Sequence, residues 1–487
     1  MKTITTQSIL FIGLTITGTV SAQNEVDALR YSRPFLSGTA RYTAMGGSFG
    51  ALGADFSNLS FNPAGVALYK KSELTFTPSI FAGNTVSDYN GTVLSNNKYG
   101  FNIGNAGLVI GSYWGEEKTT GWFGSGIGLG YNRLASFHNR MDIEGINTTS
   151  SFLNIFINRM NSGDGKLLSE MNPMDEELFW NTYLVNPSDT FDTTNYYVSV
   201  IQDGAKLLQR KNKEASGSLG EWIFSLGGNY SNRLYLGATV GVPVLYYKET
   251  TSFQEILQDD TISPLSQYSF NQDLVTQGYG VNFKFGFIYR INNWVRFGGA
   301  VHTPTFLQLS DEYTNAVRSE FRDGTEYSDK ADGAMNYQLN TPLKFTSSLG
   351  IIVKKIGSVN IDYEFLDYGE PRLRSSYYKY FDENKSIESK YTEANNIKIG
   401  TEWLLESFSI RAGWGVYGSP FKKGLTEGTA TVYSGGFGLR EEGYFLDFGY
   451  SYTKYNESYY LYDPAFVPAA GLTNFSHNFL VTLGYKF

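Results

Sequence analysis

The fold is decided by stretches such as residues 281–290, which read VNFKFGFIYR. Alternate side chains from Val281 to Tyr289 are all apolar, whereas the positions between them include Asn282 and Lys284. Because successive side chains of a β-strand point to opposite faces, this strand has one apolar and one polar face. Such an alternation predicts a half-buried strand of a sandwich or a barrel.

The same alternation recurs at residues 359–365, 408–416, 444–453 and 478–487. Short turns are expected at residues 115–121, 231–233, 292–293, 354–358, 405–407 and 441–443. Long polar connections are expected at residues 84–104, 138–216, 250–276, 311–341, 367–395, 418–428 and 456–475. Short and long connections alternate, as the periplasmic turns and extracellular loops of outer-membrane barrels do, whereas a sandwich has no reason to sort its loops by length. We therefore predict an all-β fold, a transmembrane antiparallel β-barrel of about 14 strands.

Composition agrees with this class of protein. Of the 487 residues 16% are aromatic and only 18% are charged, and the formal net charge is −8, which argues against a nucleic-acid partner. The chain contains no cysteine, so it has neither a disulfide framework nor a thiolate site. Its three histidines, His138, His302 and His477, are too scattered to predict a metal site, and we expect no cofactor.

The first residues have the features of an export signal. Lys2 provides a positive charge, residues 9–20 form an apolar core, and Val20-Ser21-Ala22 is a small-residue cleavage site. A buried helix is the alternative. We predict a signal peptide over residues 1–22, and a protein located in the outer membrane of a bacterium.

Residues 37–69 differ from every strand-like segment that follows. They are rich in small residues and show no sustained alternation. Small side chains allow backbones to approach closely, and repeated glycine permits tight turns. We predict that residues 23–71 form a plug inside the lumen of a barrel made by residues 72–487.

The last strand ends in an aromatic residue. Phe479, Val481, Leu483, Tyr485 and Phe487 form an unbroken apolar face that contacts lipid in a barrel. This face resembles the terminal signature of bacterial outer-membrane proteins, which implies the barrel-assembly machinery as a partner through Phe487. An ordinary strand that ends in Phe is the alternative.

The small-residue N-terminal segment, the triplet Asn62-Pro63-Ala64 and the expected strand number together resemble the outer-membrane long-chain fatty-acid transporter (FadL-like) family. Residues 28–53 resemble the version found in Bacteroidetes-type bacteria. The resemblance implies a monomeric, non-enzymatic transporter for passive uptake of hydrophobic compounds such as long-chain fatty acids. It further implies that extracellular loops capture the ligand, that a pocket above an N-terminal hatch receives it, and that a kinked strand opens a lateral exit into membrane lipid.

Two groups of residues are candidates for the gating parts. Phe61, Asn62, Pro63 and Ala64 would form the gate of the hatch, since Pro63 fixes its own φ and restricts the residue before it; a simple turn is the alternative. Glycine weakens a strand and permits a kink, and the third strand carries Gly124, Gly126, Gly128 and Gly130 on one face. Room for the plug is the alternative explanation of these glycines.

The largest connection, residues 138–216, is the candidate capture loop. It contains the apolar side chains Phe152, Ile155, Phe156, Phe179 and Trp180. A loop in water seldom carries so many apolar side chains unless they bind or cover something. The alternative to a hydrophobic capture site is a helical lid over the barrel mouth.

Charges of both signs are expected to face the lumen, including Lys284, Arg290, Arg296, Lys344, Asp362, Glu364, Lys398, Glu402, Arg411 and Asp447. Such charges need partners, so we expect them to pair with one another and with the plug, although a charged substrate path is a second possibility.

Three other functions remain as alternatives. Some proteins of this architecture are binding or scaffold proteins of the cell surface or of a secretion apparatus. A haem-related receptor would use His302 as an axial ligand. An open porin is disfavoured by the plug, and the Gly-x-Ser-x-Gly match at residues 46–50 lacks the context of a hydrolase elbow.

Overall fold

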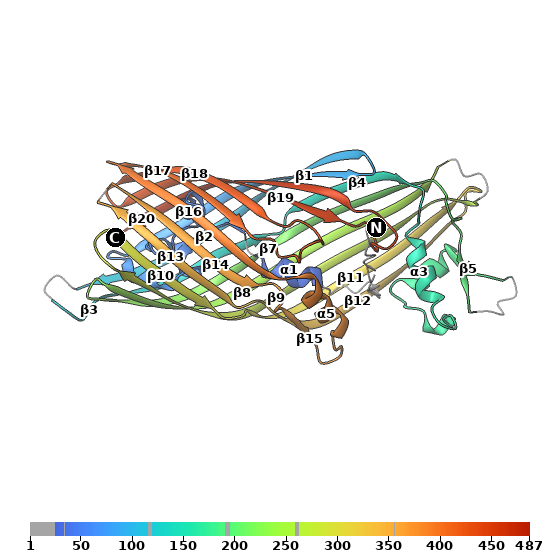
Figure 1. Ribbon diagram of the computed structural model, residues 1–487, viewed down its shortest axis with the longest axis horizontal. Helices are drawn as coiled ribbons and strands as arrows, with labels where there is room; N and C mark the ends of the chain where they lie inside the picture. The colour runs from blue at the N-terminus through green and yellow to red at the C-terminus, as the bar shows by residue number, and fades with distance from the viewer. Residues whose placement is uncertain (1–24, 34, 115–118, 190–194, 259–262, 355) are drawn as a thin grey trace, which may run out of the picture.

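The computed structural model describes residues 25–33, 35–114, 119–189, 195–258, 263–354 and 356–487. The predicted signal peptide, residues 1–22, lies outside the described residues. Most of the described chain forms long, tilted antiparallel strands around a lumen (Figure 1).

One sheet forms the wall. In the described part of the chain it contains eighteen segments, and β20 pairs with β1 to close a barrel. They are β1 (Glu73–Tyr89), β2 (Thr92–Tyr113), β3 (Trp122–Ser136), β4 (Asn139–Asn147), β7 (Leu207–Tyr230), β8 (Leu234–Leu257), β9 (Leu265–Arg290), β10 (Val295–His302), β11 (Phe306–Phe321), β12 (Glu326–Asn340), β13 (Lys344–Val353), β14 (Gly357–Asp367), β15 (Arg372–Arg374), β16 (Glu393–Leu405), β17 (Phe408–Tyr417), β18 (Ala430–Glu441), β19 (Tyr444–Tyr459) and β20 (Ala470–Lys486).

Several segments are parts of one interrupted strand. β3 and β4 both pair with β7, and β10 and β11 both pair with β9. In the same way β12 and β13 pair with β11 and β10, and β15 follows β14. Counted as continuous strands, the barrel has fourteen, which confirms the predicted number.

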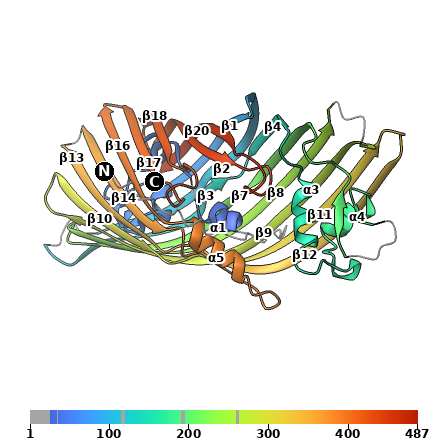
Figure 2. The ribbon, with the colours of Figure 1, turned by 45° about the vertical axis from the view of Figure 1, so that its right-hand side comes forward.

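The two ends of the barrel differ. The C-terminus of β20 and the short turns lie at one end, which we call the turn end (Figure 1). At the opposite end, the loop end, the segment between β4 and β7 forms a lid from α3 (Leu153–Met160), η3 (Leu168–Glu170), α4 (Glu176–Asn181), β5 (Val185–Pro187) and β6 (Tyr197–Ser199). A further helix, α5 (Phe381–Lys390), lies beside the wall between β15 and β16 (Figure 2).

Several predicted loops are strands. Residues 84–104 form most of the β1–β2 hairpin, whose turn at Asn90 and Gly91 has positive φ angles of 50° and 83°. Much of residues 250–276 and 311–341 likewise belongs to strands. The prediction of long loops there was wrong because the strands continue beyond the apolar band, where many outward side chains are polar. Their inward faces still carry apolar side chains, such as Phe253, Phe270 and Val317, which pack against the lid.

The outer surface of the wall is apolar around much of its circumference. Phe283, Phe285 and Phe287 of β9 are exposed, whereas Asn282 and Lys284, at alternating positions, are buried on the lumen side. An outward apolar band with a polar interior is typical of transmembrane barrels. None of the described helices is both long enough and apolar enough to cross a membrane.

The N-terminal segment lies inside the barrel, consistent with the predicted plug. It contains α1 (Glu25–Ser32), α2 (Ala40–Ala44), η1 (Phe56–Ser60) and η2 (Pro63–Leu68), of which α1 is visible beside α5 (Figure 2). We call residues 37–69 the hatch. Small residues allow it to touch the wall: a Cβ atom at Gly413 would lie 2.2 Å from Gly46 N.

Candidate functional site

The predicted gate residues form a rigid bend at the start of η2. Asn62 Oδ1 accepts a hydrogen bond from Ala64 N at 3.1 Å, and Pro63 occupies the first turn of the helix, where a missing N–H is harmless. Asn62 Nδ2 donates to Gly50 O at 2.6 Å and to Phe287 O of β9 at 3.2 Å. One side chain therefore caps η2 and also ties the hatch to the wall.

The wall is shaped to receive this bend. A Cβ atom at Gly286 of β9 would lie 2.0 Å from Asn62 Oδ1, and one at Gly237 of β8 would lie 2.3 Å from the carbonyl carbon of Pro63. Contacts this short are not tolerated, so only glycine fits at either position.

Phe61 is held by other wall strands, β10 and β16. Its carbonyl oxygen accepts a hydrogen bond from His302 Nε2 at 2.7 Å, and the Lys398 ammonium lies 4.4 Å from its ring centroid. Glu364 holds Lys398 and Lys344 at 3.5 and 3.4 Å. His302 Nε2, which would be the axial ligand in a haem receptor, is thus buried against the hatch. The described residues contain no group of His, Asp or Glu suited to a metal ion.

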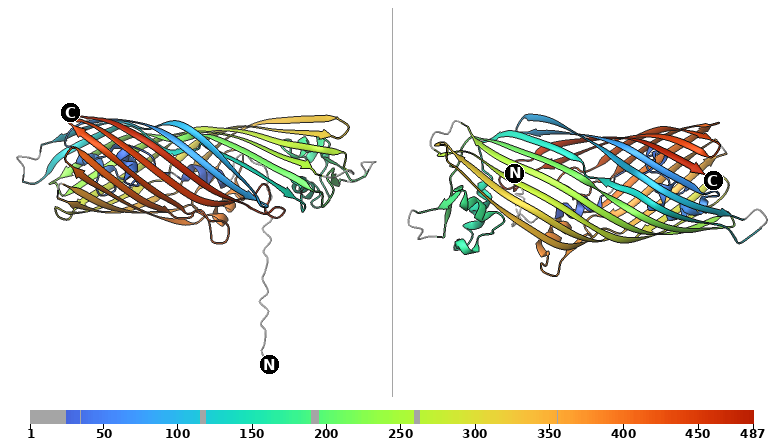
Figure 3. Two further views of the ribbon diagram at one scale, coloured as in Figure 1. Left: turned by 90° about the horizontal axis from the view of Figure 1, so that it is seen from above. Right: turned by 180° about the vertical axis from the view of Figure 1, so that it is seen from behind.

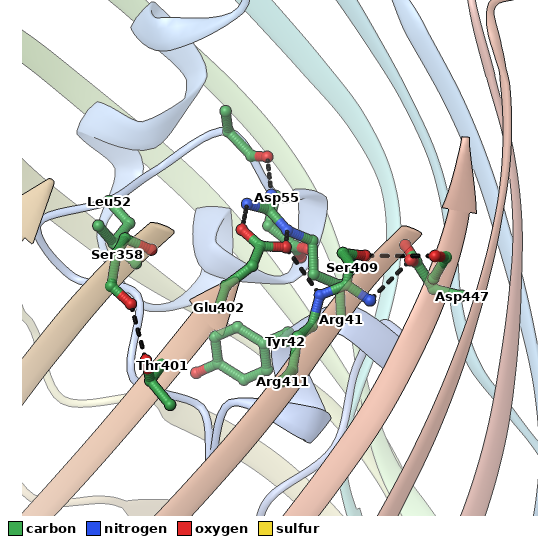
Figure 4. Close-up of polar contacts among 12 residues, drawn as sticks. Arg41, Tyr42, Leu52, Asp55, Ser358, Thr401, Glu402, Ser409, Arg411 and Asp447 are labelled. Atoms are coloured by element: carbon green, nitrogen blue, oxygen red, sulfur yellow. Dashed lines mark hydrogen bonds and ion pairs between the residues drawn. The ribbon is translucent and has the colours of Figure 1, made fainter. Parts of the chain in front are cut away.

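A second anchor joins α2 to the wall through charges (Figure 4). Arg41 donates through Nε and Nη2 to the carboxylate of Glu402 at 2.9 and 2.6 Å. The same carboxylate accepts from Arg411 Nε at 2.7 Å, and Arg411 Nη1 donates to Asp447 at 2.7 Å. The expectation that lumen charges pair with one another and with the plug holds for these groups. It also holds for Asp362, which accepts from the Phe49 and Gly50 N–H groups at 2.9 and 3.2 Å.

The glycines of the third strand lie next to the hatch and the neighbouring wall. Gly126, Gly128 and Gly130 lie within the regular β2–β3 and β3–β7 ladders, whereas Gly124 borders a register shift between Trp122 and Gly124 in the pairing of β3 with β7. A Cβ atom at Gly126 would lie 2.3 Å from Val66 O, and one at Gly128 would lie 2.6 Å from a Leu59 methyl carbon. The structure therefore supports the alternative explanation for Gly126 and Gly128, room for the plug, and the irregularities of β3 lie beside Gly124 and between Arg133 and Ala135.

The chain departs from the regular ladder a few residues later. β3 pairs with β2 only as far as Asn132, opposite Asn105, and its pairing with β7 shifts register between Arg133 and Ala135. Beyond this point β2 pairs only with β1 and β4 only with β7 in the described chain. We call the line between residues 92–104 and 133–147 the seam.

Contacts that involve side chains cross the seam in place of a ladder. Arg133 Nε donates to Ile103 O at 3.3 Å, and Asn96 Oδ1 accepts from Asp142 N at 3.3 Å. The His138 ring packs on Gly100, where a Cβ atom would lie 3.2 Å from the ring. The seam is a place where the wall can part without loss of a backbone ladder.

A cavity of about 340 Å³ lies inside the barrel behind the seam. The N-terminal segment contributes Val26, Leu29 and Phe35 to its lining. β3, β4 and the link between them contribute Arg133, Ala135, Ser136, Phe137, His138, Asn139 and Met141. Arg133 Nη1 is buried and has no hydrogen-bond partner among the described residues. The cavity therefore combines a largely apolar lining with several charged residues, Arg30, Arg33, Lys213 and Glu457 besides Arg133, and the Arg133 Nη1 group is an unsatisfied donor.

Sequence reasoning missed the seam, the cavity and the position of Arg133 in the cavity lining. The seam depends on which strands pair beyond Asn132, and the cavity collects residues from both ends of the chain. The sequence signal nearest to the seam is the change from a glycine-rich to a polar stretch after Gly130, which is compatible with an irregular strand.

The predicted capture residues lie in the lid. Phe152, Phe156 and Phe179 are buried in one cluster with residues of β8, β9 and β20, while Ile155 and Trp180 are partly buried against it. The rings of Phe156 and Phe179 are 4.2 Å apart between centroids. In this conformation the aromatic side chains fill a lid core.

No family model and no curated protein matches the sequence. Solved structures do match it. A FadL homologue of Pseudomonas aeruginosa has a TM-score of 0.56 at 12% identity, with 93% of this chain and 99% of that chain covered. The toluene transporters TodX of Pseudomonas putida and TbuX of Ralstonia pickettii have TM-scores of 0.52 and 0.50 at 12% and 15% identity, with the same coverage. The chain thus has the fold of the FadL-type channels.

Proposed function

We propose that the protein is a bacterial outer-membrane transporter for passive uptake of hydrophobic compounds such as long-chain fatty acids. The lid captures the ligand when it loosens, the cavity receives it, and the seam releases it laterally into the membrane above the hatch. The observation that carries the proposal is the position of the cavity, directly behind a stretch of wall that has no ladder. The likeness to a FadL homologue supports it.

The location follows from the outer surface of the barrel. Aromatic side chains are exposed near the turn end, as at membrane interfaces, and include Trp122, Tyr230, Tyr289, Trp294, Tyr444 and Tyr485. The turn end then faces the periplasm and the loop end faces the medium, as in other outer-membrane barrels.

Arg133 favours a ligand with an anionic group over a neutral hydrocarbon. A buried guanidinium donor without a partner is unfavourable, and a carboxylate is its strongest complement. A fatty acid supplies that carboxylate together with an apolar chain for the rest of the cavity.

A disulfide across the seam tests lateral release. Because the chain has no cysteine, the double variant Gly100→Cys/His138→Cys introduces a single pair of thiols at positions that are in contact. We expect uptake of a labelled long-chain fatty acid into cells to fall to background after oxidation and to recover after reduction.

The matched control is Ile110→Cys/Ile127→Cys, which joins the same two strands within their existing ladder. Its oxidation leaves uptake unchanged if the seam is the exit. Equal uptake through the oxidised seam variant would contradict lateral release. Fatty-acid binding by purified protein without any uptake would instead support the binding or scaffold role.

A further inference from the structure

A second concave surface lies on the outside of the barrel wall, on strands other than those that border the seam. This outer groove has a volume of about 1030 Å³ and crosses β8, β9, β11 and β12. Its centre follows one row of paired residues, in which Leu245 is opposite Gly278 and Leu309 is opposite Gly278 and Tyr337. Leu245, Leu309 and Tyr337 are buried on the lumen side, so the lining consists of the outward side chains on either side of this row.

The groove lies where the outer surface changes from apolar to polar. Toward the turn end the outward side chains are apolar and include Val240, Val242, Phe283, Phe285 and Phe306. Toward the loop end they include Lys248 and Glu312. Val244, Tyr246 and Tyr279 line the groove and are exposed, with Gln277, Gln308 and Gln338 beside them. In a transmembrane barrel this level corresponds to the border between hydrocarbon and headgroups.

One end of the groove is covered by a loop. β15 pairs with β12, and Ser375 Oγ donates to Asn336 O at 3.2 Å, which places residues 374–377 over the outer face. Leu373 is buried, so its neighbour Arg374 points outward, and Tyr377 is 93% exposed. The segment that runs from the end of β15 into α5 protrudes sideways from the wall (Figures 1 and 3).

We propose that the outer groove binds a lipid of the surrounding outer leaflet that has a negatively charged, phosphate-bearing headgroup. The acyl chains lie on Val244 and the phenylalanines below it, and the headgroup lies against the three glutamine amides and Arg374. Charge and position together select this occupant. Exposed apolar side chains border the groove on its turn-end side, and its lining carries one positive and no negative side chain. The inference depends on the proposed outer-membrane location but not on transport.

The test is native mass spectrometry of the full-length protein in detergent, titrated separately with dioleoyl phosphatidylglycerol and dioleoyl phosphatidylcholine. We expect one lipid site that prefers phosphatidylglycerol. Gln308→Trp, which fills the groove, removes this site for both lipids. Arg374→Ala keeps the site but lowers the preference for phosphatidylglycerol over phosphatidylcholine by about fivefold, the usual effect of one basic side chain at an anionic membrane surface.

Arg318→Ala is the control, because Arg318 is also exposed toward the loop end but lies outside the groove and pairs with Glu326. Folding of each variant is checked by its heat-modifiable migration on gels. Unchanged lipid binding by Gln308→Trp, or equal effects of Arg374→Ala and Arg318→Ala, would overturn the proposal. A dimer that Gln308→Trp dissociates would assign the groove to a second copy of the chain. Fatty-acid uptake by Gln308→Trp equals that of the wild type, so this result is independent of the transport proposal.

Discussion

Arg41 of the hatch donates two hydrogen bonds to Glu402 of the barrel wall, and Arg411 of the neighbouring strand binds the same carboxylate (Figure 4). Arg411 is fully buried and Glu402 nearly so. Two cations therefore share one anion at the point where the plug meets the barrel, and the stability of the closed lumen depends on that anion.

Glu402→Gln should loosen the hatch. Removal of one member of a buried ion pair costs about 3–5 kcal/mol. Here Arg41 loses its carboxylate partner, whereas Arg411 keeps Asp447. We expect larger and more frequent conductance steps in planar bilayers than for the wild type. Glu441→Gln, an exposed change at a turn, should behave as the wild type. Identical conductance for Glu402→Gln and the wild type would show that the anchor does not hold the lumen closed.

Gly286→Ala should displace the Asn62-Pro63-Ala64 bend. The new Cβ atom would lie 2.0 Å from Asn62 Oδ1, so the bend must move away from β9. We expect faster labelling of a cysteine placed at Ala67, which is buried in the docked hatch. The matched control is Gly471→Ala in β20, where a Cβ atom meets nothing within 4 Å. Equal labelling rates in both variants would refute the close fit.

Arg133→Met should change ligand preference. It removes the unsatisfied guanidinium while it keeps an apolar stem of similar length, so binding of a fatty acid should weaken by about tenfold or more and binding of the corresponding alcohol should not. Competition of each compound with a fluorescent fatty acid measures the preference. Arg133→Lys should restore part of the preference for the fatty acid over the alcohol. If the acid and the alcohol weaken equally, Arg133 does not contact the headgroup.

Phe156→Ala should open the lid. Phe156 is fully buried in the lid core, and truncation of a buried Phe typically costs about 3–5 kcal/mol. Limited proteolysis from outside the cell should then cut residues 148–206 faster than in the wild type. Leu167→Ala, at a half-exposed lid position, serves as the control. Unaltered cleavage would mean that the aromatic cluster does not hold the lid.

Hatch docking should strengthen as the pH falls from 7.5 to 5. Burial raises the pKa of Asp55 to about 6, against the opposing effects of Arg41 and Thr39. The carboxyl of a detached hatch titrates near its ordinary pKa of about 4, so docking takes up a proton between these two values. The docked state is therefore favoured below pH 6 and loses this advantage above it. Labelling of the Ala67→Cys thiolate, corrected with a free thiol for its own pH dependence, should slow at pH 5. Asp55→Asn should abolish the difference in corrected labelling rate between pH 5 and pH 7.5. Faster corrected labelling at pH 5 would contradict the prediction.

The amino-acid sequence by itself determined the barrel. Side-chain alternation such as that of Val281 to Tyr289 is a local property. Successive side chains of a strand point to opposite faces, so the alternation needs only a strand with one face toward lipid and the other toward the polar lumen. The small residues of 37–69 predicted a plug for the same local reason, and the lumen charges predicted partners because buried charges need them.

Only the tertiary structure decided where the wall can part. The seam exists because β2 stays with β1 and β4 with β7 after Asn132, a choice of pairing among strands with similar polar sequences. Likewise the cavity, the outer groove and the contact of Asn62 with Gly286 bring together residues distant in sequence. Register and close approach are set by the closed cylinder as a whole, and no short segment contains that information.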